Sequence, residues 1–398
     1  MCARKVRSAR STFVHAVCCV RIAPTATSSG VRPGHQRCGP KRRASAAYRR
    51  SSRAFSRSRG GPGIRRERRD GEAESVLGFI LLLQSLTIAV SGPATSPEYL
   101  PLRVADAEGY FADAGLRVTL RTTRAESGAA EALAQKEADL AATSVEAALR
   151  FGAAKTGEAP RIVFGLSAAP PVVLAVPARS TDTTRSVEDL AGTIVGISSP
   201  GAPEQTWFLA LLAKADLRVT QVSLMSYGEL GLGTALAEGQ VRAGLIGEPL
   251  ASRLLADGTV SVLADFRDPQ GLAQALGRPT VHAAVFESAR ARLRDAELVA
   301  LSHALLRALS RIESASPEEL AERLPRAVVG RPDDFAVRLA GTKKIYLHNG
   351  VVGADALQAT IAMIREHIPL PRVLRIPRTS EMIRGEPLRK ALTPARSR

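Results

Sequence analysis

The regular alternation of short apolar segments with helical segments from about Ser85 onward is the feature that most constrains the fold. Apolar segments typical of strands occur at Leu86 to Val90, Leu116 to Leu120, Asp139 to Ala142 and Ile162 to Leu166. Strands that alternate with helices form a largely parallel sheet, because parallel neighbours need a long crossover connection. The sequence therefore predicts an α/β fold.

A second series of strand and helix segments predicts a second lobe. Strands are expected at Thr193 to Ile197 and Ala243 to Ile246, and the segment Thr280 to Phe286 is expected to return to the first sheet. The chain would then cross between the lobes near Val176 to Arg179 and again near Gly277 to His282. Two crossings form a hinge, so we expect two α/β lobes with mainly parallel sheets and a ligand in the cleft between them.

The formal net charge of +17 belongs almost entirely to the first part of the chain. Met1 to Ser75 holds 19 of the 55 Lys and Arg residues and 4 of the 38 Asp and Glu residues, which leaves 36 and 34 for the remainder. This basic leader lacks apolar periodicity and is rich in Ser, Ala, Gly and Pro, so we expect it to be disordered. Two interpretations stay open: an arm that binds nucleic acid or lipid through its arginines, and a translation start assigned too far upstream.

The apolar run Val76 to Val90 has about the length of a signal-peptide core and is too short for a comfortable membrane span. Alternation at Leu86, Ile88 and Val90 indicates that its second half is the first strand. Our predicted segments are therefore a leader at 1–75, a signal-like segment at 76–84, lobe 1 at 85–177 plus 281–370, lobe 2 at 178–280, and a C-terminal tail at 371–398.

Several segments together resemble the NMT1/THI5-like and SsuA-like branch of periplasmic substrate-binding proteins. They are Pro101 to Leu120, Lys136 to Leu149, Leu190 to Leu217 and Ala235 to Leu255. The resemblance implies a type II periplasmic-binding-protein-like fold and the function of an extracytoplasmic solute receptor of an ABC importer. It also implies permease and ATPase subunits as partners, a periplasmic or extracytoplasmic location, and hinge closure around a small molecule. We further expect a monomer without a nucleic-acid partner.

One departure from the family bears on the ligand. The family's second-lobe loop commonly offers backbone N–H groups to an anion, whereas Pro203 lacks an N–H and Glu204 places negative charge in the first helical turn. This weakens the case for a sulfonate or nitrate ligand and leaves neutral and cationic molecules open.

The candidate ligand-binding residues lie where predicted strands meet helices. They are Ser96, Tyr99, Thr143, Ser144, Ser167, Ser199, Gly201, Ala202, Trp207 and Glu248. Structural roles compete at several of these positions: Tyr99 and Trp207 suit the core, and Ser144 suits a helix cap. Glu248 could hold an ammonium group or be a solvated loop acid.

An enzyme on the same fold, such as a pyrimidine-precursor synthase or a dehydratase, is the alternative function. All four cysteines, Cys2, Cys18, Cys19 and Cys38, lie in the leader, so the body has no thiol nucleophile. The sequence shows no phosphate loop, nucleophile elbow or paired-His motif, and its histidines lack metal-ligand spacing. We therefore expect a protein that is not an enzyme and has no catalytic residue, metal or cofactor.

Overall fold

The computed structural model describes residues 84–393 except 124, 154–156, 181–182, 200–201, 292 and 377. The leader predicted at residues 1–75 and the signal-like segment up to residue 83 lie outside the described residues. None of the described helices is long and apolar enough to cross a membrane.

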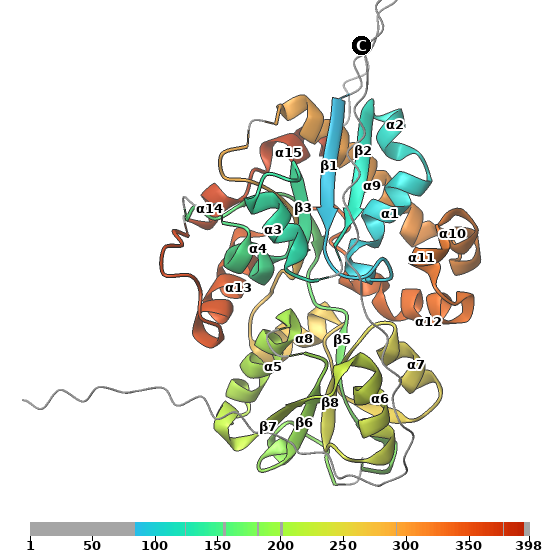
Figure 1. Cartoon of the computed structure of the whole chain (residues 1–398), viewed down its shortest axis with the longest axis vertical. Helices are drawn as coiled ribbons and strands as arrows, with labels where there is room; N and C mark the ends of the chain where they lie inside the picture. The colour runs from blue at the N-terminus through green and yellow to red at the C-terminus, as the bar shows by residue number, and fades with distance from the viewer. Residues whose placement is uncertain are drawn as a thin grey trace, which may run out of the picture. The chain divides into compact units, whose positions relative to one another are not determined.

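The described part contains two five-stranded sheets (Figure 1). The first has the strand order β2-β1-β3-β10-β4 and the second the order β7-β6-β8-β5-β9. The first sheet consists of β1 (Gln84–Val90), β2 (Leu116–Thr122), β3 (Leu140–Ser144), β4 (Arg161–Ser167) and β10 (Ala283–Glu287). The second consists of β5 (Val172–Pro177), β6 (Ile194–Ile197), β7 (Ser223–Ser226), β8 (Ala243–Gly247) and β9 (Val260–Asp265).

Helices cover both sheets. Those of the first lobe are α1 (Leu100–Ala107), α2 (Tyr110–Asp113), α3 (Gly128–Ala134), α4 (Val145–Phe151), α9 (Asp295–Ser314), α10 (Pro317–Arg323), α11 (Arg326–Val329), α12 (Pro332–Thr342), α13 (Ala354–His367), α14 (Thr379–Met382) and α15 (Glu386–Leu392). Those of the second lobe are α5 (Pro203–Lys214), α6 (Gly228–Glu238), α7 (Leu250–Ala256) and α8 (Pro269–Leu276).

One strand in each sheet is antiparallel to its neighbours, and both are the strands by which the chain enters a lobe. β5 pairs antiparallel with β8 and β9, and β10 pairs antiparallel with β3 and β4. The chain leaves one sheet at the carboxyl ends of its strands and enters the other sheet at the facing carboxyl ends. The entering strand must therefore be antiparallel to its neighbours. The predicted bilobal fold with mainly parallel sheets and two crossings is thereby confirmed.

The position of the first crossing differs from our expectation. Val172–Pro177 is β5 of the second sheet, so the chain crosses at residues 168–171 and not near Val176 to Arg179. The run is buried along its whole length, because it is an interior strand of the second sheet. An apolar run after β4 does not itself reveal which sheet it joins. The first lobe's N-terminal part therefore ends before residue 172 and not at 177.

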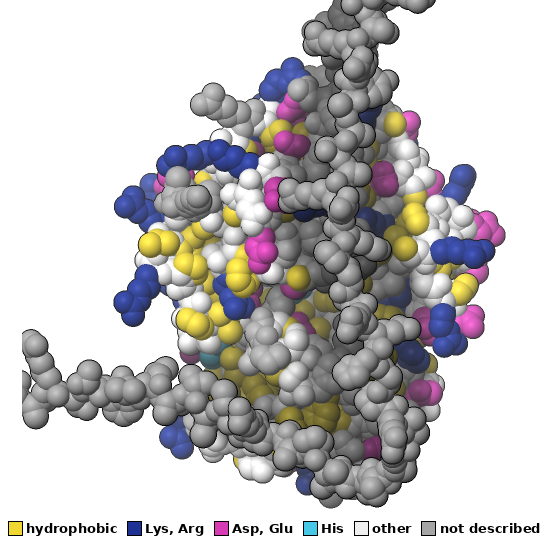
Figure 2. Space-filling model, in the orientation of Figure 1, with side chains coloured by type: hydrophobic (Ala, Val, Ile, Leu, Met, Phe, Trp, Pro, Cys, Tyr) yellow, Lys and Arg dark blue, Asp and Glu magenta, His cyan; other side chains and the backbone are white. Residues whose placement is uncertain are grey.

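The first sheet is buried on both faces, which explains its apolar strands. Leu86, Ile88 and Val90 of β1 belong to a core cluster with residues of α1 and α9. Ala89 points to the opposite face and belongs to a cluster with residues of α3 and α4. Charged side chains of both signs are interspersed on the face shown in Figure 2, in keeping with the nearly balanced charge of the body.

The predicted C-terminal tail is instead folded onto the first lobe up to residue 393. Helix α15 packs against α9, and Leu388 is buried in the core cluster of that lobe. Arg384 reaches the buried carboxylate of Glu287 on β10 at 2.8 Å and Asp295 at the start of α9 at 2.7 Å. The prolines and arginines of this segment suggested a loose end, but one cation joins it to a buried anion of the central sheet.

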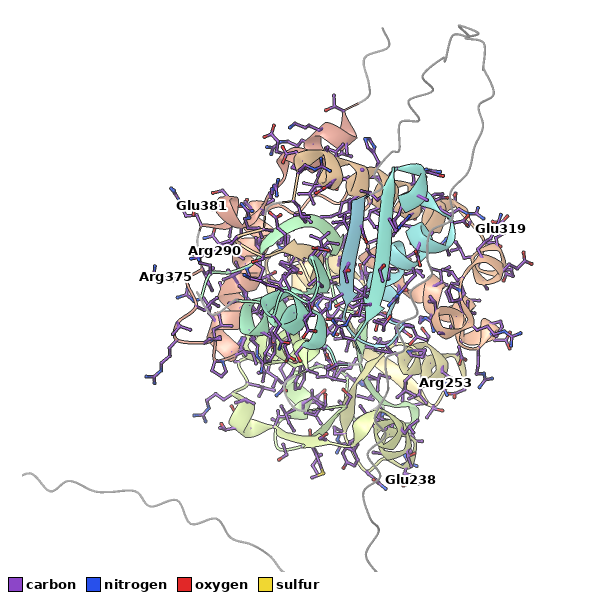
Figure 3. The ribbon with its side chains drawn as sticks, turned by 45° about the horizontal axis from the view of Figure 1, so that its top comes forward. Glu238, Arg253, Arg290, Glu319, Arg375 and Glu381 are labelled. Atoms are coloured by element: carbon purple, nitrogen blue, oxygen red, sulfur yellow. The ribbon has the colours of Figure 1, made fainter. Side chains whose placement is uncertain are left out.

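Replacing Arg384 by Ala should destabilise the protein. Glu287 would keep only Arg161 as a cationic partner, and a buried carboxylate that loses a partner costs about 3 kcal/mol of unfolding free energy. Urea denaturation measures the loss. Arg378→Ala is the matched control, because Arg378 and its partner Glu381 are exposed and such pairs contribute about 0 to 1 kcal/mol. Glu381 lies at the surface in Figure 3. Equal losses in the two variants would contradict the clamping role of Arg384.

Candidate functional site

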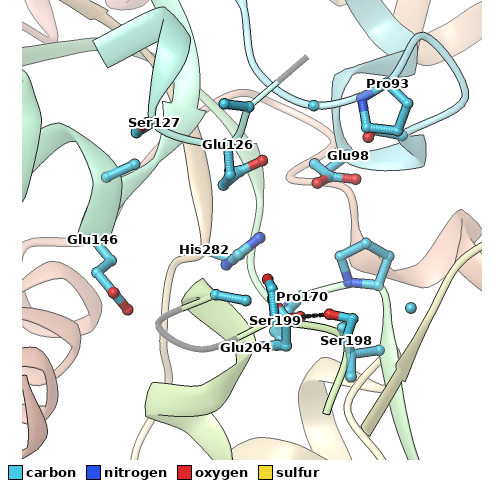
Figure 4. A pocket seen from close by; sticks show the side chains of 18 of the residues that line it. Pro93, Glu98, Glu126, Ser127, Glu146, Pro170, Ser198, Ser199, Glu204 and His282 are labelled. Atoms are coloured by element: carbon cyan, nitrogen blue, oxygen red, sulfur yellow. Dashed lines mark hydrogen bonds between the residues drawn. The ribbon is translucent and has the colours of Figure 1, made fainter. Parts of the chain in front are cut away.

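A cavity of about 570 Å³ lies between the two lobes, where the carboxyl ends of the parallel strands face each other (Figure 4). Its walls come from the turns after β1, β2 and β3 in the first lobe and after β6 and β8 in the second. Pro170 and Pro171 of the first crossing and His282 of the second also line it. Ligands of open α/β sheets bind at this edge, and the volume suits a small organic molecule.

Five glutamates line the cavity, one from each of five strand-to-helix turns. They are Glu98 after β1, Glu126 after β2, Glu146 after β3, Glu204 after β6 and Glu248 after β8. Carboxylates are favourable in the first turn of a helix, because the helix dipole is positive there. Glu98, Glu146 and Glu204 occupy such first turns. Glu126 and Glu248 lie just before α3 and α7, so all five bring negative charge to helix starts at the cavity.

Two of the glutamates are paired with arginine. Arg150, one turn further along α4, contacts Glu146 at 2.7 Å. Arg267, which follows β9, contacts Glu248 at 2.9 Å and Asp265 at 2.7 Å. Glu248 also accepts hydrogen bonds from the hydroxyl and the backbone N–H of Ser252. These contacts satisfy the Glu248 carboxylate from within its own lobe.

Glu98 is the most isolated of the five. Its side chain lines the cavity although the residue is only 7% exposed, and Oε2 has no hydrogen-bond partner among the described residues. Burial is the main cause that raises the pKa of Glu98 to about 7. A hydrogen bond from the residue's own backbone opposes this shift, and the negative charges of Glu204 and Glu248 across the cleft add to it. Glu98 is therefore near its midpoint of titration at neutral pH.

Glu126 lies on the same side of the cavity as Glu98 (Figure 4). Its carboxylate is held by Tyr99. The Tyr99 hydroxyl donates a hydrogen bond to Glu126 Oε1 at 3.0 Å, and Ser91 Oγ donates to the Glu126 carbonyl at 2.6 Å. Burial and the nearby Glu98 hold the pKa of Glu126 well above its usual range, and the Tyr99 hydrogen bond opposes that shift.

His282 lines the cavity but is held in the core by aromatic packing. Its ring meets Trp207 edge-on, with the ring centroids 5.9 Å apart. Burial lowers the pKa of His282 to about 3, so the imidazole is neutral at physiological pH. The ring therefore adds no positive charge that would offset the carboxylates.

A hydrogen bond across the cleft joins the lobes beside the cavity. Thr206 on α5 of the second lobe donates to Glu146 on α4 of the first. The elements α13 and α5 pack against each other on this side, and α12 and α7 on the other. The described lobes thus contact each other on either side of the hinge.

The predicted site residues divide into those that line the cavity and those that do not. Ser96, Ser199, Ala202 and Glu248 line it, and Gly201 lies outside the described residues. Pro203 begins α5 with Glu204 in its first turn, as the sequence indicated. Ligand contact by these residues stays a prediction.

The other predicted residues lie behind the cavity wall, where they have structural contacts. Ser144 caps α4 by accepting a hydrogen bond from the Ala147 N–H at 3.1 Å. The Thr143 and Ser91 hydroxyls are hydrogen-bonded to each other at 2.8 Å, and Ser167 is fully buried. Tyr99 supports Glu126, and Trp207 belongs to the core of the second lobe.

Sequence reasoning missed Glu98, Glu126 and Glu146 as lining residues. Each could have been found from one shared signal, a glutamate in the turn between a predicted strand and its helix. The sequence-based candidates in those turns were mainly hydroxyl residues. In the described part of the chain no group of His, Asp and Glu side chains is arranged to hold a metal ion.

Replacing Glu98 by Gln should stabilise the protein at pH 8 more than at pH 5. Folding raises the pKa of Glu98 from 4.5 to about 7. Between pH 4.5 and pH 7, Glu98 therefore keeps its proton in the folded protein and loses it in the unfolded chain. Stability therefore falls as pH rises through this window and stays lower above it. Glutamine has no charge to desolvate. At pH 8 the unfolding free energy of E98Q should therefore exceed that of the wild type by about 3 kcal/mol.

Urea denaturation at the two pH values measures this difference, with the exposed Glu322→Gln as control. An advantage of E98Q that is equal at pH 5 and pH 8 would contradict the raised pKa.

Comparison with known proteins agrees with the fold and the place of the cavity. Residues 96–254 match the protein family described as NMT1/THI5 like. The curated proteins yielded no match to this sequence.

Solved structures with the same fold cover nearly the whole described part. A protein from Bordetella bronchiseptica RB50 has 24% sequence identity and a TM-score of 0.62, over 77% of this chain and 96% of that one. The periplasmic aliphatic sulphonate binding protein SsuA from Escherichia coli has 16% identity and a TM-score of 0.59, over 73% and 95%. The periplasmic nitrate-binding protein NrtA from Synechocystis PCC 6803 has 12% identity and a TM-score of 0.59, over 78% and 88%.

The predicted resemblance is thereby confirmed. The described part of the chain has the two-lobed fold of these periplasmic binding proteins, and residues 96–254 match the NMT1/THI5-like family.

Proposed function

We propose that this protein is the solute-binding component of an ABC importer and captures a small molecule between its lobes. The observation that carries the proposal is the 570 Å³ cavity, whose walls come from both lobes and from both crossings. A ligand there contacts two bodies that are joined by only two chain segments. Its binding energy therefore favours a closed arrangement over an open one.

The contacts beside the cavity suit such a movement. Thr206 and Glu146 meet across the cleft through one hydrogen bond, and this bond can break and form as the lobes separate and close. The crossing at residues 168–171 contains Pro170 and Pro171, which restrict the backbone to few conformations. Movement between two defined states is what a permease needs in order to distinguish the loaded receptor from the empty one.

We propose a receptor and not an enzyme. His282 is the cavity's candidate base, but burial lowers its pKa to about 3 and its ring packs against Trp207. The body of the chain has no cysteine that could act as a nucleophile. The glutamates with raised pKa are the remaining candidates for proton transfer, so recovery of the ligand after incubation is an essential control.

The remaining elements of the proposal come from the family. We propose an extracytoplasmic location, permease and ATPase subunits as partners, and action as a monomer. The two named neighbours are periplasmic proteins by their descriptions, and the match to the NMT1/THI5-like family supports the same assignment here.

Filling the cavity should weaken ligand binding without unfolding the protein. Ser199 is exposed and lines the cavity from the second lobe, so Ser199→Trp places a large ring in the ligand's volume. We expect any ligand found by thermal-shift screening of the full chain to bind S199W at least tenfold more weakly. Glu322→Trp, on the outer surface of α10, should bind it like the wild type.

The ligand should be recovered chemically unchanged, and small-angle scattering should show compaction when it binds. Consumption of the ligand would favour the enzyme. Equal binding by S199W and wild type would place the ligand outside the cleft and contradict the proposal.

A further inference from the structure

The cavity contains a buried acceptor that lacks a donor. Glu98 Oε2 has no hydrogen-bond partner among the described residues, and only 7% of the residue's surface is exposed. An unsatisfied buried carboxylate oxygen is costly, because it has lost its water without gaining a donor. Such an atom on a cavity wall indicates that a ligand supplies the missing donor.

The neighbouring charges define what kind of donor fits. Glu126 lies on the same side of the cavity as Glu98, and Glu204 faces them from α5 with a hydrogen bond from Ser198 Oγ at 3.4 Å (Figure 4). Three arginines in the described part of the chain interact with the glutamates of the cavity, and each is engaged. Arg150 pairs with Glu146, Arg267 pairs with Glu248 and Asp265, and the buried Arg338 donates to the carbonyls of Val328 and Val329. The potential in the cavity is therefore negative, which repels an anion and attracts a cation.

We propose that the ligand is an organic cation with an N–H-bearing nitrogen, a protonated amine or amidine, bound between Glu98 and Glu126. This inference rests on the proposed receptor function and names its ligand class. A charged N–H donor satisfies Glu98 Oε2 and offsets the repulsion between the two carboxylates. Tyr99 holds Glu126 in place through Oε1.

The rest of the cavity suits the uncharged part of such a molecule. Pro93, Pro97, Pro170 and Pro171 line it together with Phe151, and they offer rigid apolar surface without further charge. When the lobes close, Glu204 of the second lobe also approaches the bound nitrogen. The glutamates of both lobes would then contribute to the same cation, and this would couple binding to closure.

The titration of the glutamates gives the proposal a second readout. A cation favours the ionised carboxylates, so binding releases protons from Glu98 and Glu126, and affinity increases as pH rises from 5 to 8. The titratable groups that interact with Glu98 are Glu126, Glu204, Glu248 and the buried Tyr99 and Tyr346. None of these becomes positively charged in this range, so the sign of the effect is fixed by the carboxylates.

A charge-matched panel on the full chain tests the proposal. The probes are cations (putrescine, spermidine, arginine and benzylamine), the neutral benzyl alcohol, and anions (benzenesulfonate, methanesulfonate and nitrate). Thermal-shift measurements at pH 8 identify binders, and isothermal titration calorimetry in two buffers of different ionisation enthalpy measures affinity and proton release. The variants are E98Q and E126Q, with E322Q on the outer surface as the matched control.

We expect at least one cation to bind saturably with proton release, and no anion to do so. Both cleft variants should weaken that cation at least tenfold, while E322Q should leave its affinity unchanged. Saturable binding of an anion that is lost in S199W would overturn the cation proposal and leave the receptor function standing. If no compound binds, the cation proposal is overturned and the receptor function loses its support. If a cation binds E98Q and E126Q as tightly as the wild type, the assignment of Glu98 and Glu126 as its ligands is overturned.

Discussion

The arrangement of the whole site depends on the two places where the chain crosses between sheets. Because β5 and β10 enter the opposite lobe from its carboxyl edge, the strand ends of both sheets face the same space. Every turn from a parallel strand into a helix at these edges contributes to one cavity. The fold therefore determines where a ligand binds before any side chain determines which ligand it is.

Side chains in those turns determine the charge of this cleft. A related fold can use free N–H groups at helix starts to hold an anion, as expected for receptors of sulfonate or nitrate. Here the helix starts carry their own carboxylates, and α5 begins with a proline that has no N–H. The protein's own carboxylates thus already neutralise the positive ends of these helix dipoles. The negative charge that remains explains why burial and repulsion raise the pKa of Glu98 and Glu126.

Much of this architecture could be predicted from the sequence, because periodicity and helix caps are local signals. The strands at Leu86 to Val90, Ile162 to Leu166 and Ala243 to Ile246 lie where the pattern indicated. The sheet that receives Val172–Pro177 could not be deduced, since an interior strand has the same apolar pattern in either lobe. The C-terminal segment is held by contacts between distant residues, such as Arg384 with Glu287 and α15 with α9, and these leave no local signal.

The site was predictable in position and less so in chemistry. Hydroxyl residues at strand ends drew attention to the correct turns, and Ser96 and Ser199 line the cavity. Glu98, Glu126 and Glu146 were not predicted from the sequence, because a glutamate near a helix start has an ordinary structural explanation. Only the structure shows that the five lie around one buried space and that one carboxylate oxygen has no donor.

The account depends most directly on the protonation of Glu98, which carbon-13 NMR of the glutamate side-chain carboxyl carbons can follow between pH 4 and pH 9. Assignment comes from the resonance that disappears in E98Q. The structure predicts that this carboxyl titrates near pH 7 in the empty protein and at a lower pH when a cationic ligand is bound. Titration at the ordinary value near 4.5 in the empty protein would contradict a buried carboxylate whose Oε2 has no donor in the cleft.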